Sequence, residues 1–121
     1  MPRRRHPTTS IPVINLETGM PLVHQALAHL DRELAAGREH RHAILKLIHG
    51  YGSSGVGGSL RIELQKELQR MAGAGVVRSF IAGEQWRVSD EKTWELLKRF
   101  PEWKRDSDLG KNNKGISLVF L

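Results

Sequence analysis

The chain has 121 residues, which is enough for one domain with a modest hydrophobic core. Its 19 Lys and Arg residues outnumber its 13 Asp and Glu residues, and the resulting net charge of +6 favours polyanions such as nucleic acid as partners. The chain contains no cysteine, which excludes disulfides, thiolate metal sites and cysteine nucleophiles, and no apolar run is long enough for a membrane span. We therefore expect a cytoplasmic protein.

The first part of the chain predicts an arm, a strand, a helix and a second strand. Residues 1–10 (MPRRRHPTTS) are expected to form a flexible basic arm. A short strand is expected over residues 11–17 (IPVINLE), where β-branched residues occur. Over residues 20–36, apolar residues recur at spacings of three and four, which predicts an amphipathic helix that ends at Gly37. The almost continuous apolar run at 41–48 (RHAILKLI) predicts a strand that is covered on both faces.

The second part of the chain predicts one more helix and two more strands. A helix is expected to start near Ser59 and to end with Gly73 as its C-terminal cap. Strands are expected over residues 76–81 (VVRSFI) and 115–121 (GISLVFL). The order β-α-β-α-β-(insert)-β predicts a two-layer α/β sandwich with right-handed crossovers and a mixed sheet that has a mainly parallel core. The whole of residues 11–121 is expected to be one domain.

The insert at about 85–114 carries all three tryptophans of the chain among many lysines and arginines. Ser89 is expected to cap a short helix in it. We expect Trp94 to pin this helix onto the sheet. For Trp86 and Trp103, burial and stacking against nucleic-acid bases are equally compatible with the sequence.

The segment His49–Arg61 (HGYGSSGVGGSLR) is rich in glycine and lies between a predicted strand and a predicted helix. Its GYGSSG matches the dinucleotide-binding pattern GxGxxG, but the next predicted strand does not end in the acidic residue that would hold a ribose. A P-loop needs Lys and then Ser or Thr after its last glycine, whereas this chain has Ser59-Leu60-Arg61. Glycine N–H groups and the start of a helix nevertheless favour phosphate. The segment therefore predicts phosphate binding without a nucleotide cofactor.

The same segment resembles the second motif of the Smr domain, a family named after the small MutS-related proteins. In that motif a strand ends in His-Gly-x-Gly, a small Ser/Gly turn follows, and Leu-Arg opens a helix. The closing stretch NNKGISLVFL (112–121) fits as well, and the resemblance covers most of the chain. Smr domains are α/β sandwiches that bind nucleic acid, and several members cleave DNA or RNA, so the resemblance implies DNA or RNA as the partner. The residues that it implies as contacts are His49, Gly50, Gly52, Ser53, Ser54, Gly55, Gly57, Gly58 and Arg61.

The first motif of the family is altered in this chain. Catalytic Smr domains carry Leu-Asp-x-His-Gly at the end of the first strand, and here INLETG places Asn15 and Glu17 at the Asp and His positions. Asn15 cannot ionise but can orient a phosphate, so it joins the implied contacts. Glu17 could act as a general base together with His49, although its carboxylate repels a phosphodiester unless a metal bridges the two or it is protonated. The resemblance thus implies nucleic-acid binding, with an endonuclease of altered chemistry and a protein-interaction module as the alternatives.

Four further histidines, His24, His29, His40 and His42, match no metal-ligand spacing. We therefore predict no metal site and no cofactor, while a divalent metal used during cleavage stays open. The sequence does not discriminate DNA from RNA, and we expect a monomer.

Overall fold

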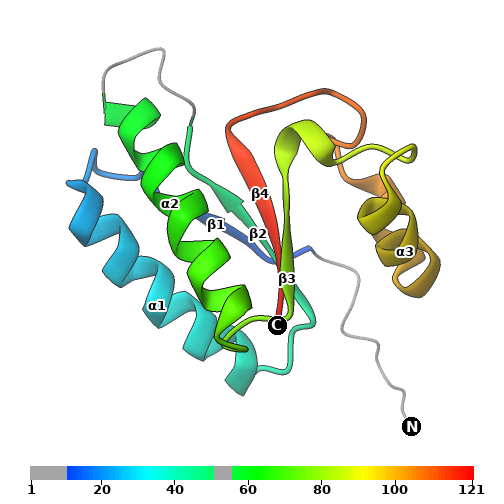
Figure 1. Ribbon diagram of the computed structural model, residues 1–121, viewed down its shortest axis with the longest axis horizontal. Coiled ribbons are helices and arrows are strands. Elements are labelled where there is room, and N and C mark those ends of the chain that lie inside the picture. The colour runs from blue at the N-terminus through cyan, green and yellow to red at the C-terminus, as the bar shows by residue number, and fades with distance from the viewer. Residues whose placement is uncertain (1–10, 51–55) are drawn as a thin grey trace, which may run out of the picture.

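The computed structural model describes residues 11–50 and 56–121, and within them four strands form one sheet (Figure 1). The strands are β1 (Val13–Asn15), β2 (Ile44–Ile48), β3 (Ser79–Ala82) and β4 (Ile116–Phe120). Their order across the sheet is β1-β2-β4-β3. β1 pairs with β2 in parallel, whereas β4 pairs antiparallel with both β2 and β3. The predicted basic arm, residues 1–10, lies outside the described residues.

The predicted α/β class and the mixed sheet are confirmed, but the sheet core is less parallel than we predicted. β1, β2 and β3 run in one direction, yet β4 lies between β2 and β3, so that only one of the three strand pairings is parallel. The apolar run of β4 shows that both of its faces are covered, and it carries no information about which strands lie beside it.

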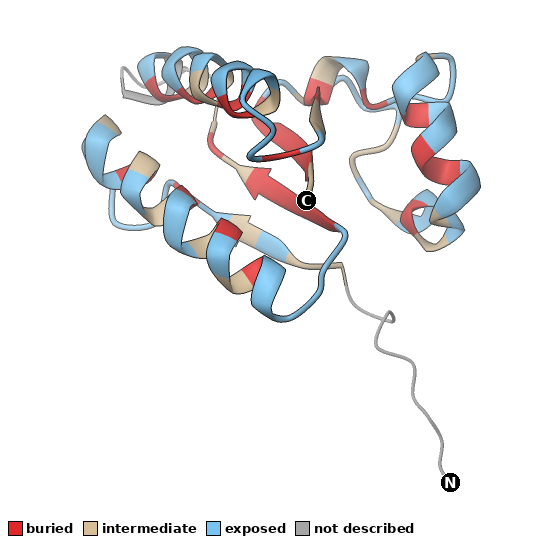
Figure 2. Ribbon diagram, turned by 60° about the horizontal axis from the view of Figure 1, so that its bottom comes forward, coloured by how far each residue is buried: buried red, intermediate tan, exposed pale blue. Residues whose placement is uncertain are grey.

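Helices α1 (Val23–Glu39) and α2 (Val56–Gly73) cover one face of the sheet (Figures 1 and 2). Their apolar positions recur every three or four residues and meet the side chains that β2 directs to the same face. Leu30, Leu34, Leu64, Leu68, Leu45 and Leu47 are buried together in this cluster. The alternate residues of β2, Ile44, Lys46 and Ile48, face the opposite side of the sheet. Because both sides are covered, the strand is apolar at every position except Lys46.

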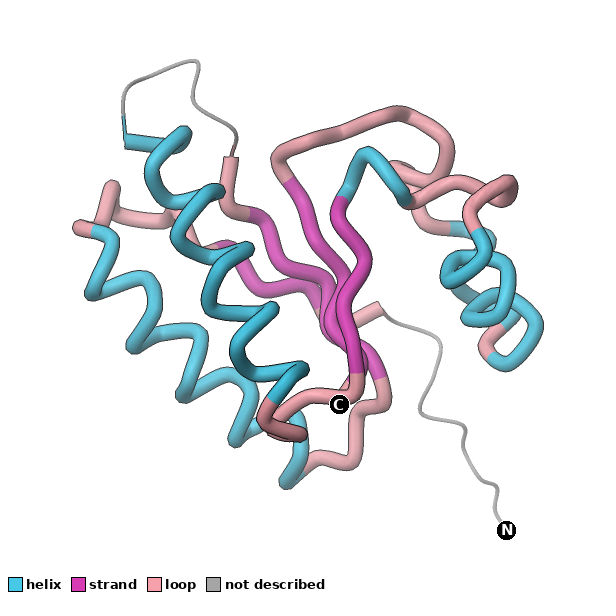
Figure 3. The backbone as a smooth tube through the Cα atoms, viewed as in Figure 1, coloured by secondary structure: helices cyan, strands magenta, loops and turns pink. Residues whose placement is uncertain are grey.

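The insert covers the other face of the sheet, where it adds a partial third layer to the predicted two. It contains α3 (Glu91–Arg99) and the 3₁₀ turn η3 (Pro101–Arg105), and both lie on the opposite side of the sheet from α1 and α2 (Figure 3). Another 3₁₀ turn, η2 (Gly83–Gln85), connects β3 to the insert. The buried residues between this layer and the sheet are Ile44, Ile81, Trp86, Leu96, Leu97, Trp103, Ile116 and Leu118.

The structure answers the open question for Trp86 and Trp103 and overturns the expectation for Trp94. Trp86 and Trp103 are buried and meet edge to face, with ring centroids 6.4 Å apart. Trp94 instead is 49% exposed, because α3 directs Leu96 and Leu97 to the core. The prediction that Trp94 pins the helix was therefore wrong, and the two tryptophans that could have stacked on bases are enclosed.

The helix boundaries predicted at Gly37 and Ser89 were also wrong. Gly37 does not end α1 but lies inside it, where a Cβ would be 2.8 Å from a methyl group of Leu121 and would have to displace that side chain. The turn after the helix is made instead by Arg41, whose φ is 60°. At α3 the cap is Asp90 rather than Ser89, and its carboxylate accepts a hydrogen bond from Thr93 N at 3.0 Å. Across residues 11–50 and 56–121, no helix is both long and apolar enough to cross a membrane.

Candidate functional site

The connections around the end of β2 meet at one end of the sheet. β2 leads into His49 and Gly50, and Gly115 immediately precedes β4. The backbone N–H groups of His49 and Gly50 both donate to the carbonyl oxygen of Gly115, at 2.8 and 3.0 Å. The start of the glycine-rich segment is therefore attached to the segment that enters β4.

Gly50 is in close contact with the turn that follows β1. Its φ is +75°, and a Cβ on it would lie 2.1 Å from Oε2 of Glu17. Asn15 shapes that turn, because its side-chain oxygen accepts a hydrogen bond from Glu17 N at 2.8 Å. The structure thus brings Asn15, Glu17 and Gly50 together, and both side chains are exposed at this end of the sheet.

His49 is fully buried and contacts both Gly50 and β4. Its Nδ1 lies 2.7 Å from the carbonyl oxygen of Gly50, and its Nε2 lies 2.9 Å from the hydroxyl of Ser117. Because a carbonyl only accepts, Nδ1 carries the proton and Nε2 accepts from Ser117. Burial lowers the pKa of His49, and the charge of Arg61 acts in the same direction, so the ring is neutral near pH 7. In this geometry His49 connects Gly50 to β4, and its predicted contact with phosphate or part in cleavage stays a prediction.

Arg61 lies in the second turn of α2 and reaches across to η2. Its Nη2 donates to Oε2 of Glu84 at 2.7 Å, and both side chains are partly exposed. The Nε atom of Arg61 and the Oε1 atom of Glu84 are buried, and neither has a hydrogen-bond partner among the described residues. The pair therefore uses only part of the guanidinium, and the side chain of Arg61 stays 24% exposed.

The other predicted contacts lie at the start of α2 or before it. Gly52, Ser53, Ser54 and Gly55 lie outside the described residues. Gly57 and Gly58, which we expected in a loop, lie in the first turn of α2, because the helix begins at Val56 rather than near Ser59. This first turn contains no acidic residue. Its N–H groups and the positive end of the helix dipole are thus not offset by a carboxylate on the helix itself.

Sequence reasoning missed Glu84 and Ser117 as parts of this site. Glu84 pairs with a residue 23 positions earlier, and Ser117 with one 68 positions earlier. No local spacing carries such a signal, and only the polar residue inside the apolar run GISLVFL could have drawn attention to Ser117. Within the described part of the chain, no group of three or more His, Asp or Glu side chains is arranged to hold a metal ion.

Comparisons with protein-family models, with curated proteins and with solved structures found no match to this chain. The resemblance to Smr domains thus stays a prediction that rests on the motifs alone.

Proposed function

We propose that this chain binds the sugar-phosphate backbone of DNA or RNA at the end of the sheet where α2 begins. The observation that carries the proposal is Arg61, which stands beside the positive end of a helix whose first turn has no acidic residue. A helix start of this kind offers N–H donors and a favourable potential to a phosphate, and an arginine adds a charged donor. The net charge of +6 supports attraction to a polyanion over a longer range.

The geometry supports binding better than cleavage. Both ring nitrogens of His49 are engaged and its side chain is enclosed, so it offers no proton-accepting atom at the surface. The carboxylate of Glu17 stands against Gly50 and repels a phosphodiester at close range. Contacts from arginine and backbone N–H groups go to phosphate and do not distinguish bases, so binding should depend little on nucleotide sequence.

The test is the fluorescence anisotropy of short labelled DNA and RNA oligonucleotides, single-stranded and duplex, titrated with the protein at several salt concentrations. We expect log K to fall linearly with log salt. The matched variants are Arg61→Gln and Arg70→Gln, because Arg70 lies on the same helix, also pairs with a glutamate, and is exposed at the other end of it. Arg61→Gln should weaken binding roughly tenfold and lower the salt slope by about 0.9, while Arg70→Gln stays close to wild type. A flat salt dependence of the wild type, or equal effects of the two variants, would contradict the proposal.

The cleavage alternative is tested with supercoiled plasmid and structured RNA in the presence of Mg²⁺. We expect both substrates to stay intact at protein concentrations that saturate binding. Cleavage by the wild type that disappears in Glu17→Gln would replace the binding proposal with an endonuclease.

A further inference from the structure

A second basic segment lies beside the proposed site. It consists of residues 110–114, here named the lysine loop, which end the insert and lead into β4 (Figure 1). Lys111 and Lys114 are exposed, and neither forms an ion pair with the described residues. Gly110 and Asn112 have φ values of 79° and 56°, so the loop turns twice through left-handed backbone.

The lysine loop is packed against both sides of the proposed site. On one side it leads into Gly115, whose carbonyl oxygen accepts hydrogen bonds from the backbone of His49 and Gly50. On the other side it approaches the start of η2 so closely that a Cβ on Gly83 would lie 1.8 Å from the carbonyl oxygen of Asn113. Its lysines are therefore presented at the same end of the sheet as Arg61.

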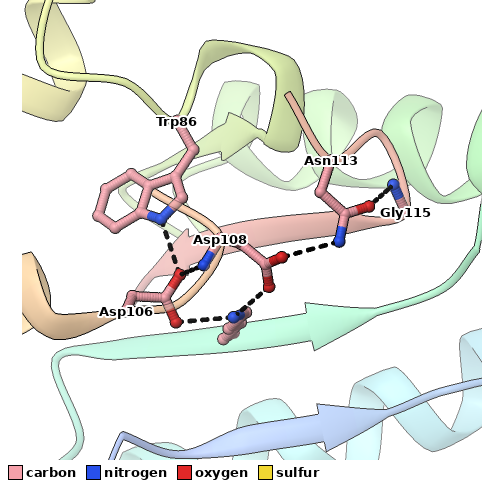
Figure 4. A network of polar contacts seen from close by, with 6 residues as sticks. Trp86, Asp106, Asp108, Asn113 and Gly115 are labelled. Carbon is pink, nitrogen blue, oxygen red and sulfur yellow. Dashed lines mark hydrogen bonds and ion pairs between the residues drawn. The ribbon is translucent and has the colours of Figure 1, made fainter. Parts of the chain in front are cut away.

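A buried ionic network determines where the loop lies (Figure 4). Lys46 of β2 is only 4% exposed, and its Nζ donates to Oδ1 of Asp106 and Oδ2 of Asp108, both at 2.6 Å. Nε1 of Trp86 donates to the second oxygen of Asp106 at 2.9 Å. Burial by itself would lower the pKa of Lys46, but the hydrogen bonds and charges of the two aspartates outweigh it and raise this pKa. The ammonium group is therefore charged.

The network continues into the lysine loop. The side-chain NH₂ of Asn113 donates to Oδ1 of Asp108 at 2.9 Å, and its side-chain oxygen accepts from Gly115 N at 2.8 Å. Burial tends to raise the pKa of Asp108, but the hydrogen bonds that it accepts from Asn113 and Lys46, together with the charge of Lys46, hold this pKa below its ordinary value. Asp106 thus turns inward to Lys46, whereas Asp108 pairs with Lys46 and still lines the hollow beside the two lysines.

We propose that the lysine loop is a second contact for backbone phosphates, in which Lys111 and Lys114 hold phosphates next to those bound at Arg61. Asp108, Asn112 and Asn113 join the two lysines in lining a hollow of about 690 Å³. Because the cations stand at separate positions, the ligand is a strand with several phosphates rather than a mononucleotide. The inference rests on the proposed function and extends its footprint from α2 across the start of β4.

The experiment compares two double variants that remove the same charge, Lys111→Gln/Lys114→Gln and Lys98→Gln/Lys104→Gln. Lys98 and Lys104 are exposed on α3 and η3, in the layer beyond the sheet. The lysine-loop variant should lower the salt slope for single-stranded and duplex oligonucleotides by roughly 0.7 to 0.9 per lysine and weaken binding about tenfold or more. The control variant should change the slope much less, and thermal unfolding should show that both are folded.

The outcomes separate the inference from the function on which it rests. If wild-type binding does not depend on salt, the proposed function fails. If the wild type and Arg61→Gln behave as expected but the two double variants are equal, only the inference about the lysine loop is overturned. A mononucleotide probe whose affinity falls as much as that of the oligonucleotides in the lysine-loop variant would refute the assignment of a multi-phosphate strand.

Discussion

Replacing Lys46 by Met should lower the free energy of unfolding by about 3–5 kcal/mol, because the substitution leaves two carboxylates without their counter-charge. The side chains of Lys46 and Asp106 are 6% and 5% exposed, and that of Asp108 is 23% exposed. Methionine is similar in length to the alkyl stem of lysine, so the substitution leaves little cavity. Trp86 and Asn113 keep their hydrogen bonds to the aspartates but supply no positive charge.

The magnitude follows from charge and burial. Two unit charges about 4 Å apart interact by roughly 4 kcal/mol at an effective dielectric constant near 20. Asp106 is almost completely buried and accounts for most of the loss, while water reaches Asp108 and reduces its share. Asp106→Asn in the Lys46→Met background should therefore recover part of the stability, because it removes the more deeply buried unpaired charge.

The assay is urea unfolding followed by tryptophan fluorescence, because the indole of Trp86 is part of the network. Lys66→Met is the control, since Lys66 is exposed and only loosely paired with Glu63. The pH dependence provides a second check. In the wild type the pKa of Asp108 is lowered, so its contribution is present above the ordinary aspartate pKa and is lost as the pH falls through the folded-state pKa. In Lys46→Met the deficit should instead shrink on acidification, as protonation neutralises the unpaired Asp108. A loss below about 1 kcal/mol, or one equal to that of Lys66→Met, would refute the reasoning.

Three further predictions concern single residues around the site. Glu84→Gln removes the anion that competes for Arg61 and should raise oligonucleotide affinity by roughly two- to fivefold in the anisotropy assay; weaker binding would count against competition. His49→Asn should flatten the pH dependence of the melting temperature. Because the pKa of His49 is lowered in the folded protein, the wild type should lose stability as the pH falls below about 6.5, the ordinary histidine pKa, and a variant profile parallel to wild type would contradict this. Gly83→Ala places a Cβ against the carbonyl oxygen of Asn113 and should lower the free energy of unfolding, measured by urea unfolding, by on the order of 3 kcal/mol. Gly73→Ala, with open space around the new Cβ, should leave this free energy almost unchanged.

The sequence predicted the fold where the signal was local. Apolar spacings of three and four identified both long helices, and the continuous run ILKLI of β2 indicated cover on two faces, which the structure confirms. The predicted burial of Trp94 was wrong because successive residues of a helix are rotated by about 100°. A small error in assigning the buried face of the helix therefore moves a side chain from the core to the solvent. The place of β4 could not be predicted, because its partners lie far away along the chain.

The candidate site was predictable only in part, for the same reason. The motifs placed Asn15, Glu17 and Gly50 at neighbouring strand ends, and the structure brings these three together. Arg61 was predicted as well, but not its pairing with Glu84, because ion pairs between distant elements leave no pattern in the sequence. The buried lysine inside ILKLI was the one visible sign of the network behind the lysine loop.

The strand order has a consequence for the way the chain folds. β3 pairs only with β4, and β4 follows all the other strands along the chain, so β3 has no strand partner until β4 is in place. β1, α1, β2 and α2 can associate earlier through the contacts of one helix layer, and β3 can pack against α2, but the strand pairing of β3 must wait for β4. Closing such long loops costs chain entropy before the contacts that offset this cost have formed, and folding is slower as a result. We therefore expect a ribosome-bound nascent chain that stops before Ile116 to leave the edge of β2 open and the apolar side chains of the insert without β4, one of the strands on which they pack.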